Sequence, residues 1–280
     1  NMHLAIVALT WAFALSVPGS SLVLKDQSNK RVCTEFFYKR IEPQGFKSAK
    51  SKLKRVCQCY KGTAYFTTLY DPAKRIPVYS AYVFAREEIY ERKKRHSTWY
   101  IEPQLADRKK GPNMETLENT TNGWFKKVKH SQAVNEDYKN SGFTRGHLNP
   151  NGHHNTPDSR NATFTLTNIA PQSKNANQEW AREYENKMTH LTAKCQRTYV
   201  VTGVVPSNST LKNQVRVNIP EFFWSAFCCV GNGGNNTTPG AYLLKNKENE
   251  TVVNMTLKRL ERHLTKKFKR EVHIFENNCT

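Results

Sequence analysis

The chain has 280 residues, with 43 Lys and Arg against 23 Asp and Glu, which gives a formal net charge of +20 at pH 7. This length allows one large α/β unit with a sizeable core and requires no second fold. The basic residues gather at 50–55, 92–95, 126–129 and 266–270, and this clustering exceeds what solubility alone needs. It predicts a polyanionic partner, with nucleic acid first and heparin-like glycans second.

Residues 1–21 are predicted to be a secretory signal peptide. An apolar run from Leu4 to Val17 precedes the small residues Gly19 to Ser21. A run of this length is short for a membrane span and suits a signal segment. A buried core helix and an uncleaved signal anchor are the alternatives. We expect a single domain over 22–280 and no membrane contact after the signal is removed.

Sequons and cysteines support the same secretory route. The Asn-x-Ser/Thr sequons are at Asn119, Asn161, Asn208, Asn235, Asn236, Asn249, Asn254 and Asn278. The cysteines are Cys33, Cys57, Cys59, Cys195, Cys228, Cys229 and Cys279. Their spacing does not suit a zinc knuckle, and they fit disulfides in an oxidising compartment. The odd count leaves one thiol free or paired between chains. These features predict a secreted, disulfide-bonded glycoprotein.

The first part of the chain is predicted to form a cap followed by strands. Residues 22–58 surround Cys33 and are predicted to be an irregular cap tied by a disulfide. Apolar and polar residues alternate over Ala64–Leu69 and Pro77–Arg86, which predicts two strands of a central sheet. The charged stretch 87–135 contains Pro and Gly and is predicted to form long loops, with a short ordered stretch at Trp99–Pro103.

The central segment carries the most distinctive residues. The chain turns through 140–142 into Thr144-Arg145-Gly146-His147, and the alternation over Ala162–Ile169 predicts a strand. Ser173 or Asn175 can begin the helix that follows. An apolar stripe at helical spacing consists of Trp180, Tyr184, Met188 and Leu191. Trp180 and Tyr184 are assigned to the core, with base stacking as the alternative. Asn177, Ala181 and Glu185 follow an i, i+4, i+8 pattern, which predicts one shared helix face.

Strands return in the last third of the sequence. They are predicted at Arg197–Val205, Glu221–Val230 and Gly240–Lys245, with a further strand considered at Val272–Phe275. The apolar residues of 253–268 predict an amphipathic C-terminal helix whose outer face is strongly basic.

The central motifs resemble the DNA/RNA non-specific endonuclease family. That family carries an Asp-Arg-Gly-His signature and, about thirty residues on, an Asn-to-Glu helix motif, which correspond here to 144–147 and to Asn177 and Glu185. Flanking motifs resemble one branch of the family over roughly 31–279. The resemblance implies an α+β fold, with a ββα-metal core built on a mixed or antiparallel sheet with flanking helices and long loops. One departure is that Thr144 stands at the family's Asp position.

The resemblance also implies site roles, which agree with the chemistry of the residues. A neutral imidazole at His147 can act as general base, and Asn177 offers one oxygen to Mg²⁺, with Mn²⁺ or another divalent ion as a substitute. Glu185 is expected to hold metal-bound waters. The arginines expected at the phosphate are Arg145 and Arg182, with Arg86 near the scissile bond or else an ordinary strand-end arginine. Supporting residues are expected at Asn168 and Thr144.

The positive charge of the basic clusters predicts contacts with the phosphates of nucleic acid. No base-reading motif accompanies these clusters, so little sequence preference is expected. The lysines chosen are Lys126, Lys127, Lys129, Lys266, Lys267 and Lys269. Together these features predict a secreted, sequence-non-specific, Mg²⁺-dependent endonuclease that acts on DNA, RNA or both.

Two alternatives remain from the residues. A zinc site could use His147, His153 and His154, although two adjacent histidines in an extended segment do not easily face one ion. The second alternative is a catalytically silent, basic protein with a nuclease fold that binds nucleic acid or heparin-like glycans. Thr144 is the sequence feature in its favour.

Overall fold

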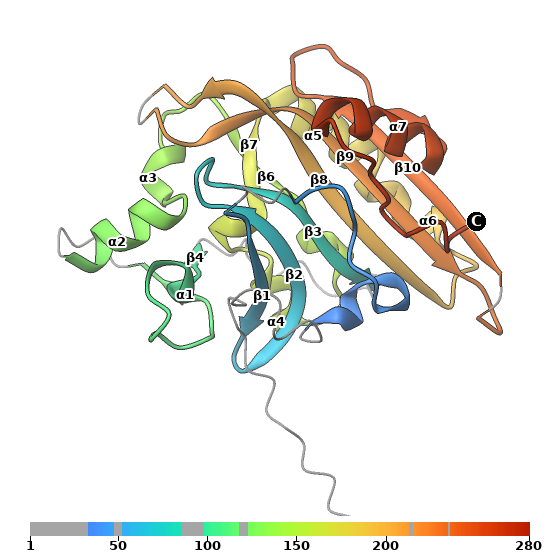
Figure 1. The fold of residues 1–280 in the computed structure, drawn as a ribbon, viewed down its shortest axis with the longest axis horizontal. Coiled ribbons are helices and arrows are strands. Elements are labelled where there is room, and N and C mark those ends of the chain that lie inside the picture. The colour runs from blue at the N-terminus through green and yellow to red at the C-terminus, as the bar shows by residue number, and fades with distance from the viewer. Residues whose placement is uncertain (1–32, 48–51, 86–97, 118–122, 213–214, 235) are drawn as a thin grey trace, which may run out of the picture.

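A seven-stranded antiparallel sheet forms the centre of the computed structural model, which describes residues 33–47, 52–85, 98–117, 123–212, 215–234 and 236–280 (Figure 1). The strand order is β1-β2-β3-β8-β9-β10-β11, and all neighbouring pairs are antiparallel. The strands are β1 Lys54–Tyr60, β2 Thr63–Asp71, β3 Ile76–Phe84, β8 Arg197–Thr210, β9 Asn218–Val230, β10 Thr237–Lys245 and β11 Val253–Met255. The predicted α+β class with an antiparallel central sheet is confirmed.

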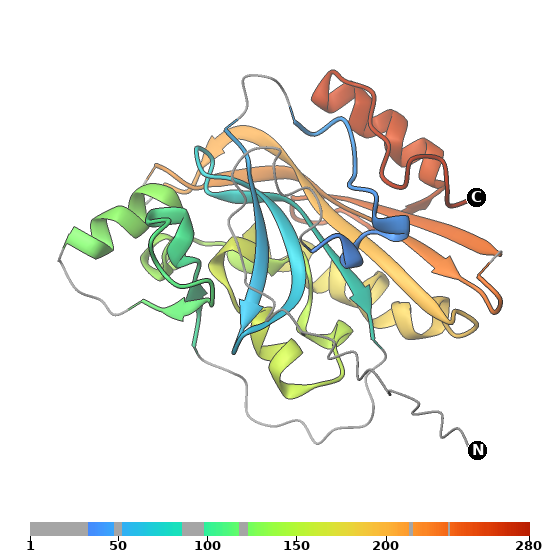
Figure 2. The ribbon, with the colours of Figure 1, turned by 60° about the horizontal axis from the view of Figure 1, so that its bottom comes forward.

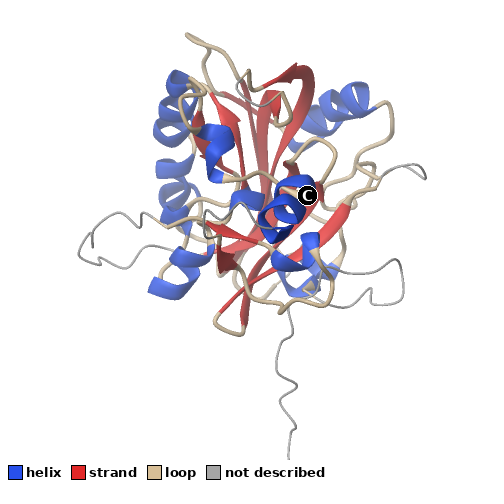
Figure 3. Cartoon of the chain, turned by 90° about the vertical axis from the view of Figure 1, so that its left-hand side faces the viewer, coloured by secondary structure: helices blue, strands red, loops and turns tan. Residues whose placement is uncertain are grey.

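Two small antiparallel sheets accompany the large one. They pair β4 Tyr100–Ile101 with β5 Glu115–Thr116, and β6 Thr144–His147 with β7 Ile169–Gln172. The helices are α1 Pro103–Ala106, α2 Gly123–Ser131, α3 Asn135–Tyr138, α4 Pro157–Ala162, α5 Lys174–Glu183, α6 Met188–Leu191 and α7 Leu257–Phe268. The 3₁₀ turns are η1 Thr34–Phe36, η2 Tyr38–Arg40, η3 Asn151–His153, η4 Leu166–Asn168 and η5 Glu185–Lys187. Figure 3 shows the strands in the middle and helices on both sides.

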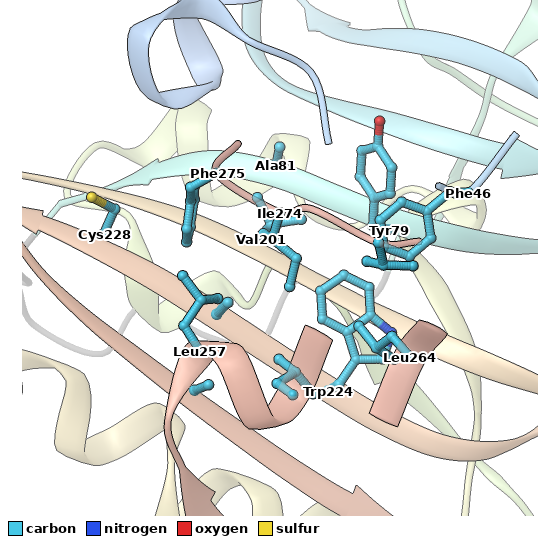
Figure 4. Packing of buried hydrophobic residues seen from close by; sticks show 14 of the residues in the cluster. Phe46, Tyr79, Ala81, Val201, Trp224, Cys228, Leu257, Leu264, Ile274 and Phe275 are labelled. Atoms are coloured by element: carbon cyan, nitrogen blue, oxygen red, sulfur yellow. The ribbon is translucent and has the colours of Figure 1, made fainter. Parts of the chain in front are cut away.

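The two faces of the large sheet bury different layers. Side chains alternate along β9, so Trp224 packs in one cluster with Leu260 and Leu264 of α7 (Figure 4). On the other face, Phe227 packs with Trp180 of α5. Figure 2 shows α7 in red on one side of the sheet and the yellow-green and yellow part of the chain on the other. Helix α7 and the segment from β6 to α6 therefore lie on opposite faces.

Disulfides tie the margins of the fold together. Cys33–Cys57 joins the N-terminal cap to β1, Cys195–Cys229 joins the start of β8 to β9, and Cys228–Cys279 joins β9 to the C-terminal segment. Cys59 is buried and belongs to none of the three. The predicted disulfide-tied cap is confirmed, except that Lys54–Gln58 is part of β1.

Several predicted elements were wrong in type or extent. The stretch 87–135 contains α1 and α2 as well as loops. The strand expected over 162–169 is replaced by the end of α4 and by η4, and β7 begins only at Ile169. Both sets of the alternation are buried, because Thr165 and Thr167 are as inaccessible as Leu166 and Asn168, so the threonines did not mark an exposed strand face. The stretch Val272–Phe275 forms no strand.

The signal peptide predicted at 1–21 lies outside the described residues, as does Arg86. Within the described part of the chain, no helix has the length and apolar character needed to cross a membrane.

Candidate functional site

The β6–β7 pair sets which signature side chains share a face. Thr144 lies opposite Gln172 and His147 lies opposite Ile169. Since side chains alternate along a strand, Arg145 and His147 project to one face and Thr144 and Gly146 to the other. Position 146 has no room for a side chain, because a Cβ there would lie 2.4 Å from Oε1 of Gln172. The glycine of the signature is therefore required by close packing against β7.

His147 is half-buried between two aromatic rings. Its ring lies 5.4 Å from that of Trp99 and 5.3 Å from that of Phe164, centroid to centroid. Burial lowers the pKa of His147 to about 4, so the imidazole is neutral at physiological pH. Its Nε2 is buried and has no hydrogen-bond partner among the described residues. The ring is thus held by packing and not by hydrogen bonds.

Arg145 is fixed on the same face. Its Nη2 donates to the backbone O and to Oδ1 of Asn135, at 3.4 and 3.2 Å. The guanidinium carbon lies 5.1 Å from the ring centroid of Trp99 and 5.4 Å from that of Tyr138. Burial lowers the pKa of Arg145 from its ordinary value, and no carboxylate forms an ion pair with it in the described part of the chain. The group is a half-buried cation whose position is set before any anion arrives.

Thr144 does not contact Arg145 through a hydrogen bond. Its Oγ1 donates to the backbone O of Gln172 at 2.9 Å, across the strand pair. The side-chain amide of Gln172 is fully buried, and both its Nε2 and its Oε1 lack partners among the described residues. The short Thr144 side chain thus leaves the opposing glutamine unsatisfied.

Asn168 uses its whole side chain in hydrogen bonds. Its Oδ1 accepts from Ser80 Oγ at 2.9 Å and from the backbone N of Asn149 at 3.0 Å. Its Nδ2 donates to the backbone O of Asn149 at 2.9 Å and of Thr163 at 3.0 Å. The residue is completely buried. This arrangement supports a role in holding the loops around β6 and β7 rather than in binding metal.

Asn177 lies on α5, which begins directly after β7. Ser173 caps the helix, with its Oγ accepting from the backbone N of Ala176, as one of the two predicted caps. Helix α5 packs against β6. Asn177 is half-buried, and its side chain makes no hydrogen bond among the described residues. The carboxamide oxygen is therefore available to a ligand.

Glu185 lies past the end of that helix, contrary to the predicted continuous face with Asn177. The helix ends at Glu183, and Tyr184 has φ −125° and ψ −67°, after which Glu185 opens η5. Leu191, the last residue of the predicted apolar stripe, is exposed, whereas Trp180 and Tyr184 are buried in the core as predicted. The large buried Tyr184 explains the break, because its ring must turn into the core, where its hydroxyl bonds Ser225.

The environment of Glu185 is unusual for a carboxyl group. Burial raises its pKa to about 8, and no cationic side chain contributes an opposing effect. Its backbone O accepts a hydrogen bond from His153 Nε2 at 3.0 Å, and His153 Nδ1 then accepts from Tyr82 Oη at 2.8 Å. His153 thus anchors the turn that carries Glu185.

The histidines do not assemble a zinc site. Both ring nitrogens of His153 are used, and His154 Nε2 donates to Asn149 Oδ1 at 2.7 Å. Across the described ranges, no group of three or more His, Cys, Asp or Glu side chains could hold a metal ion. A metal held by one carboxamide oxygen and otherwise by water does not require such a group.

The remaining predicted cations are distributed over several surfaces. Arg182 is exposed and pairs with Glu179 and Glu183. Lys126 and Lys127 are exposed on α2, where Lys127 lies 3.7 Å from Asp107, and Lys129 lies 3.9 Å from Glu136. The predicted lysines of the C-terminal helix region are Lys266, Lys267 and Lys269. Because α7 is on the opposite face of the sheet, the structure does not bring these three to the β6–α5 site.

Several residues of the site could not be found by sequence reasoning. Trp99 and Phe164 enclose His147, Asn135 holds Arg145, and His153 holds the turn of Glu185. None belongs to the signature, and each reaches the site from a separate loop or short helix. Only His153 drew attention in the sequence, and then as a metal ligand.

Comparisons with known proteins identify the family of the chain. A family model described as DNA/RNA non-specific endonuclease matches residues 48–272. The human Endonuclease domain-containing 1 protein is 32% identical over 280 residues, which cover 98% of this chain and 53% of the relative. Human mitochondrial Endonuclease G is 32% identical over 117 residues, which cover 38% of this chain and 39% of the relative. The branch predicted from the flanking motifs, that of the Endonuclease domain-containing 1 proteins, is confirmed.

A solved structure of an EndoG/EndoGI complex shares the fold, with a TM-score of 0.57 at 16% identity over 91% of this chain and 95% of that chain. The chain spans about half the length of the Endonuclease domain-containing 1 proteins that it matches.

Proposed function

The chain belongs to the DNA/RNA non-specific endonuclease family, and on this basis we propose that it is a secreted, Mg²⁺-dependent endonuclease. It would hydrolyse phosphodiester bonds of DNA, RNA or both without sequence preference. The observation that carries the proposal is the arrangement on β6 and α5. A neutral imidazole and a fixed guanidinium share one strand face, and an unpartnered carboxamide lies on the helix packed against that strand.

His147 is the group that accepts a proton. Nucleophilic attack on phosphorus needs a water that loses a proton, and a neutral imidazole can take it. Since Nε2 of His147 is enclosed, we assign the task to Nδ1. The aromatic contacts with Trp99 and Phe164 keep the ring in one orientation. For a general base, a fixed orientation matters more than a high pKa. The low pKa ensures that the imidazole remains unprotonated across the physiological pH range.

Arg145 is assigned to the reacting phosphate. Its Nη2 is used by Asn135, which leaves Nη1 to donate to a phosphate oxygen. A guanidinium already held by hydrogen bonds and aromatic faces loses little freedom when the anion binds. Its burial strengthens the attraction to negative charge, because the surroundings are less polarisable than water.

The donor set fits a hard divalent cation. Asn177 and Glu185 both offer oxygen, the amide has no competing hydrogen bond, and the carboxyl has no cationic partner among the described residues. Mg²⁺, or Mn²⁺ in its place, would be held by Asn177 with Glu185 at its bound waters, and would supply positive charge for the phosphate and the departing oxygen.

A nicking assay tests the proposal. Supercoiled plasmid and a structured RNA are incubated with the protein in Mg²⁺ and, separately, in excess chelator. Relaxed and then linear plasmid, followed by a smear without discrete bands, is expected only with Mg²⁺. Protein that retards the DNA on a gel but leaves it intact in both Mg²⁺ and Mn²⁺ would instead support a silent binding protein. The observation that favours this second function is the change at Thr144, the family's Asp position. There the buried side-chain amide of Gln172 has no hydrogen-bond partner among the described residues.

Secretion and glycosylation are part of the proposal. Three disulfides form within the described residues, and disulfides persist in oxidising compartments. Sequon asparagines with exposed side chains include Asn208, Asn236, Asn249 and Asn254. Glycosidase treatment of protein secreted from cells should lower its apparent mass, and recovery of the protein only from the cytosol would contradict secretion.

A further inference from the structure

An open cavity of about 540 Å³ lies between the start of β1, the turn from β2 to β3, helix α1 and the end of α2. Figure 1 shows α1 and α2 beside each other at one side of the sheet. The cavity's basic lining comes from four separate parts of the chain. These basic residues are Lys52, Lys54, Arg75, Arg108 and His130. Pro72, Leu105 and Ala106 contribute an apolar part of the wall.

Among the described residues, no carboxylate lines this cavity. The closest along the chain are Asp71 and Asp107, and both are engaged elsewhere. Asp71 accepts from the backbone N of Ala73 at 2.9 Å and lies 3.4 Å from Lys74 Nζ. Asp107 accepts from the backbone N of Lys109 at 3.0 Å and lies 3.7 Å from Lys127 Nζ. The positive charge of the cavity is therefore not neutralised from within the described chain.

Arg75 is the fixed cation of the cavity. Its Nη1 donates to the backbone O of Ala73 and of Arg216, at 3.2 and 3.3 Å, and its Nη2 to the backbone O of His130 at 3.3 Å. Nε is buried without a partner among the described residues. Burial, followed by the neighbouring Arg216, lowers the pKa of Arg75 from its ordinary value. Arg75 is held by backbone carbonyls and forms no ion pair with a carboxylate among the described residues, so its charge can attract an incoming anion.

The cavity is joined to the catalytic face by a short segment. His130 lines the cavity and Asn135 holds Arg145, so the two anchors are five positions apart in the chain. Five residues of chain span at most about 18 Å. Arg216 holds the same segment, through the backbone O of Gln132 at 2.8 Å and the carboxylate of Asp137. The segment from His130 to Asn135 is therefore no longer than about five nucleotide steps of a stacked strand, at roughly 3.4 Å each.

We infer that this cavity binds a backbone phosphate of the substrate strand, within about five nucleotides of the phosphate that is cleaved. The inference rests on the proposed function, because the second anchor is the reacting phosphate at Arg145. A nucleic acid strand suits the lining better than a sulfated glycan does. The strand brings flat apolar bases or sugars to the wall of Leu105 and Ala106 as well as an anion to the cations.

Binding in chelator, where no cleavage occurs, tests this inference directly. Fluorescence anisotropy is measured with end-labelled single strands of about 2 and about 12 nucleotides, between about 50 and 200 mM salt. The variant Lys52→Gln/Lys54→Gln/Arg108→Gln removes three cavity charges and leaves Arg75 in place, because Arg75 also holds backbone. The matched control Lys194→Gln/Lys247→Gln/Arg262→Gln removes the same charge from exposed positions elsewhere.

The unaltered protein and the control should bind the longer strand much more tightly than the shorter one. The cavity variant should lose most of this difference, with its affinity for the shorter strand unchanged. For the longer strand its slope of log K against log salt should become less steep by up to about 2, at about 0.7 for each lost single-strand contact. An equal loss in variant and control would overturn the inference. The inference would also be overturned if the affinity for a heparin oligosaccharide fell in the cavity variant while the affinity for the longer strand did not.

Cleavage is measured separately, with the same strands in Mg²⁺. Absence of cleavage by the unaltered protein would refute the proposed function, whereas the binding comparison alone decides the cavity. Where cleavage occurs, the variant's kcat/KM on the longer strand should fall towards its value on the shorter one, with kcat unchanged. A fall in kcat with unchanged KM would overturn the inference, because it would place these residues in the chemical step.

Discussion

Replacing Gly146 by Ala tests how the signature strand is held. The added Cβ would lie 2.4 Å from Oε1 and 2.7 Å from Cβ of Gln172, and 3.1 Å from the backbone O of Ala170. Two of these atoms belong to the rigid part of β7, so the strands must separate by several tenths of an ångström. Overpacking of this kind costs about 1–3 kcal/mol, which should lower the Tm by roughly 2–10 °C.

The same displacement should impair cleavage more than stability. Gly146 lies between Arg145 and His147, and a shift of about 1 Å in a catalytic group can cost about a hundredfold in rate. The assays are thermal unfolding and plasmid nicking on the same preparation. Gly152→Ala is the matched control, because a Cβ at 152 meets no atom within 4 Å. A Gly146→Ala protein with the Tm and rate of the unaltered protein would refute the packing argument for β6 and β7.

Three further predictions follow from the site and its surroundings. Asn177→Ala should raise the Mg²⁺ concentration needed for half-maximal cleavage more than Glu185→Gln does, since only Asn177 is assigned as a direct ligand, and equal Mg²⁺ titrations would remove that assignment. Glu102 is buried, and its pKa is raised by burial to about 8, so stability should fall as pH rises from about 4.5 to about 8, because only the unfolded chain ionises freely there. Glu102→Gln should flatten this Tm profile, and an unchanged profile would show that another group causes it. Neutralising Lys266 and Lys267 of α7 together with Lys269, which follows the helix, should leave kcat unchanged, since α7 lies on the opposite sheet face, and a large loss of kcat would contradict that placement.

The signature motif and the helix that follows it could be predicted from local pattern. Arg145, Gly146 and His147 lie in an ordered motif, and the Ser173 cap and the buried Trp180 follow ordinary helix rules. Each of these features depends on neighbours in sequence. The family resemblance was specific for the same reason, because its motifs are local.

The surroundings of the site could not be predicted in the same way. Trp99 and Asn135 reach His147 and Arg145 from separate segments, and no spacing in the sequence records such contacts. The basic outer face of α7 was predicted correctly, but only the strand order shows that it lies opposite α5. The end of α5 before Glu185 depends on how Tyr184 enters the core, which is a tertiary effect.

The central claim is that His147 is the general base of a phosphodiesterase. The most direct measurement compares plasmid cleavage by His147→Ala with that by His190→Ala, an exposed histidine on α6, at equal Mg²⁺. Loss of a general base should slow cleavage by about 10²–10⁴-fold, while DNA affinity measured in chelator stays within a few fold. His190→Ala should cleave like the unaltered protein. Cleavage by His147→Ala within a few fold of the unaltered rate would contradict the claim and leave His147 a structural residue between Trp99 and Phe164.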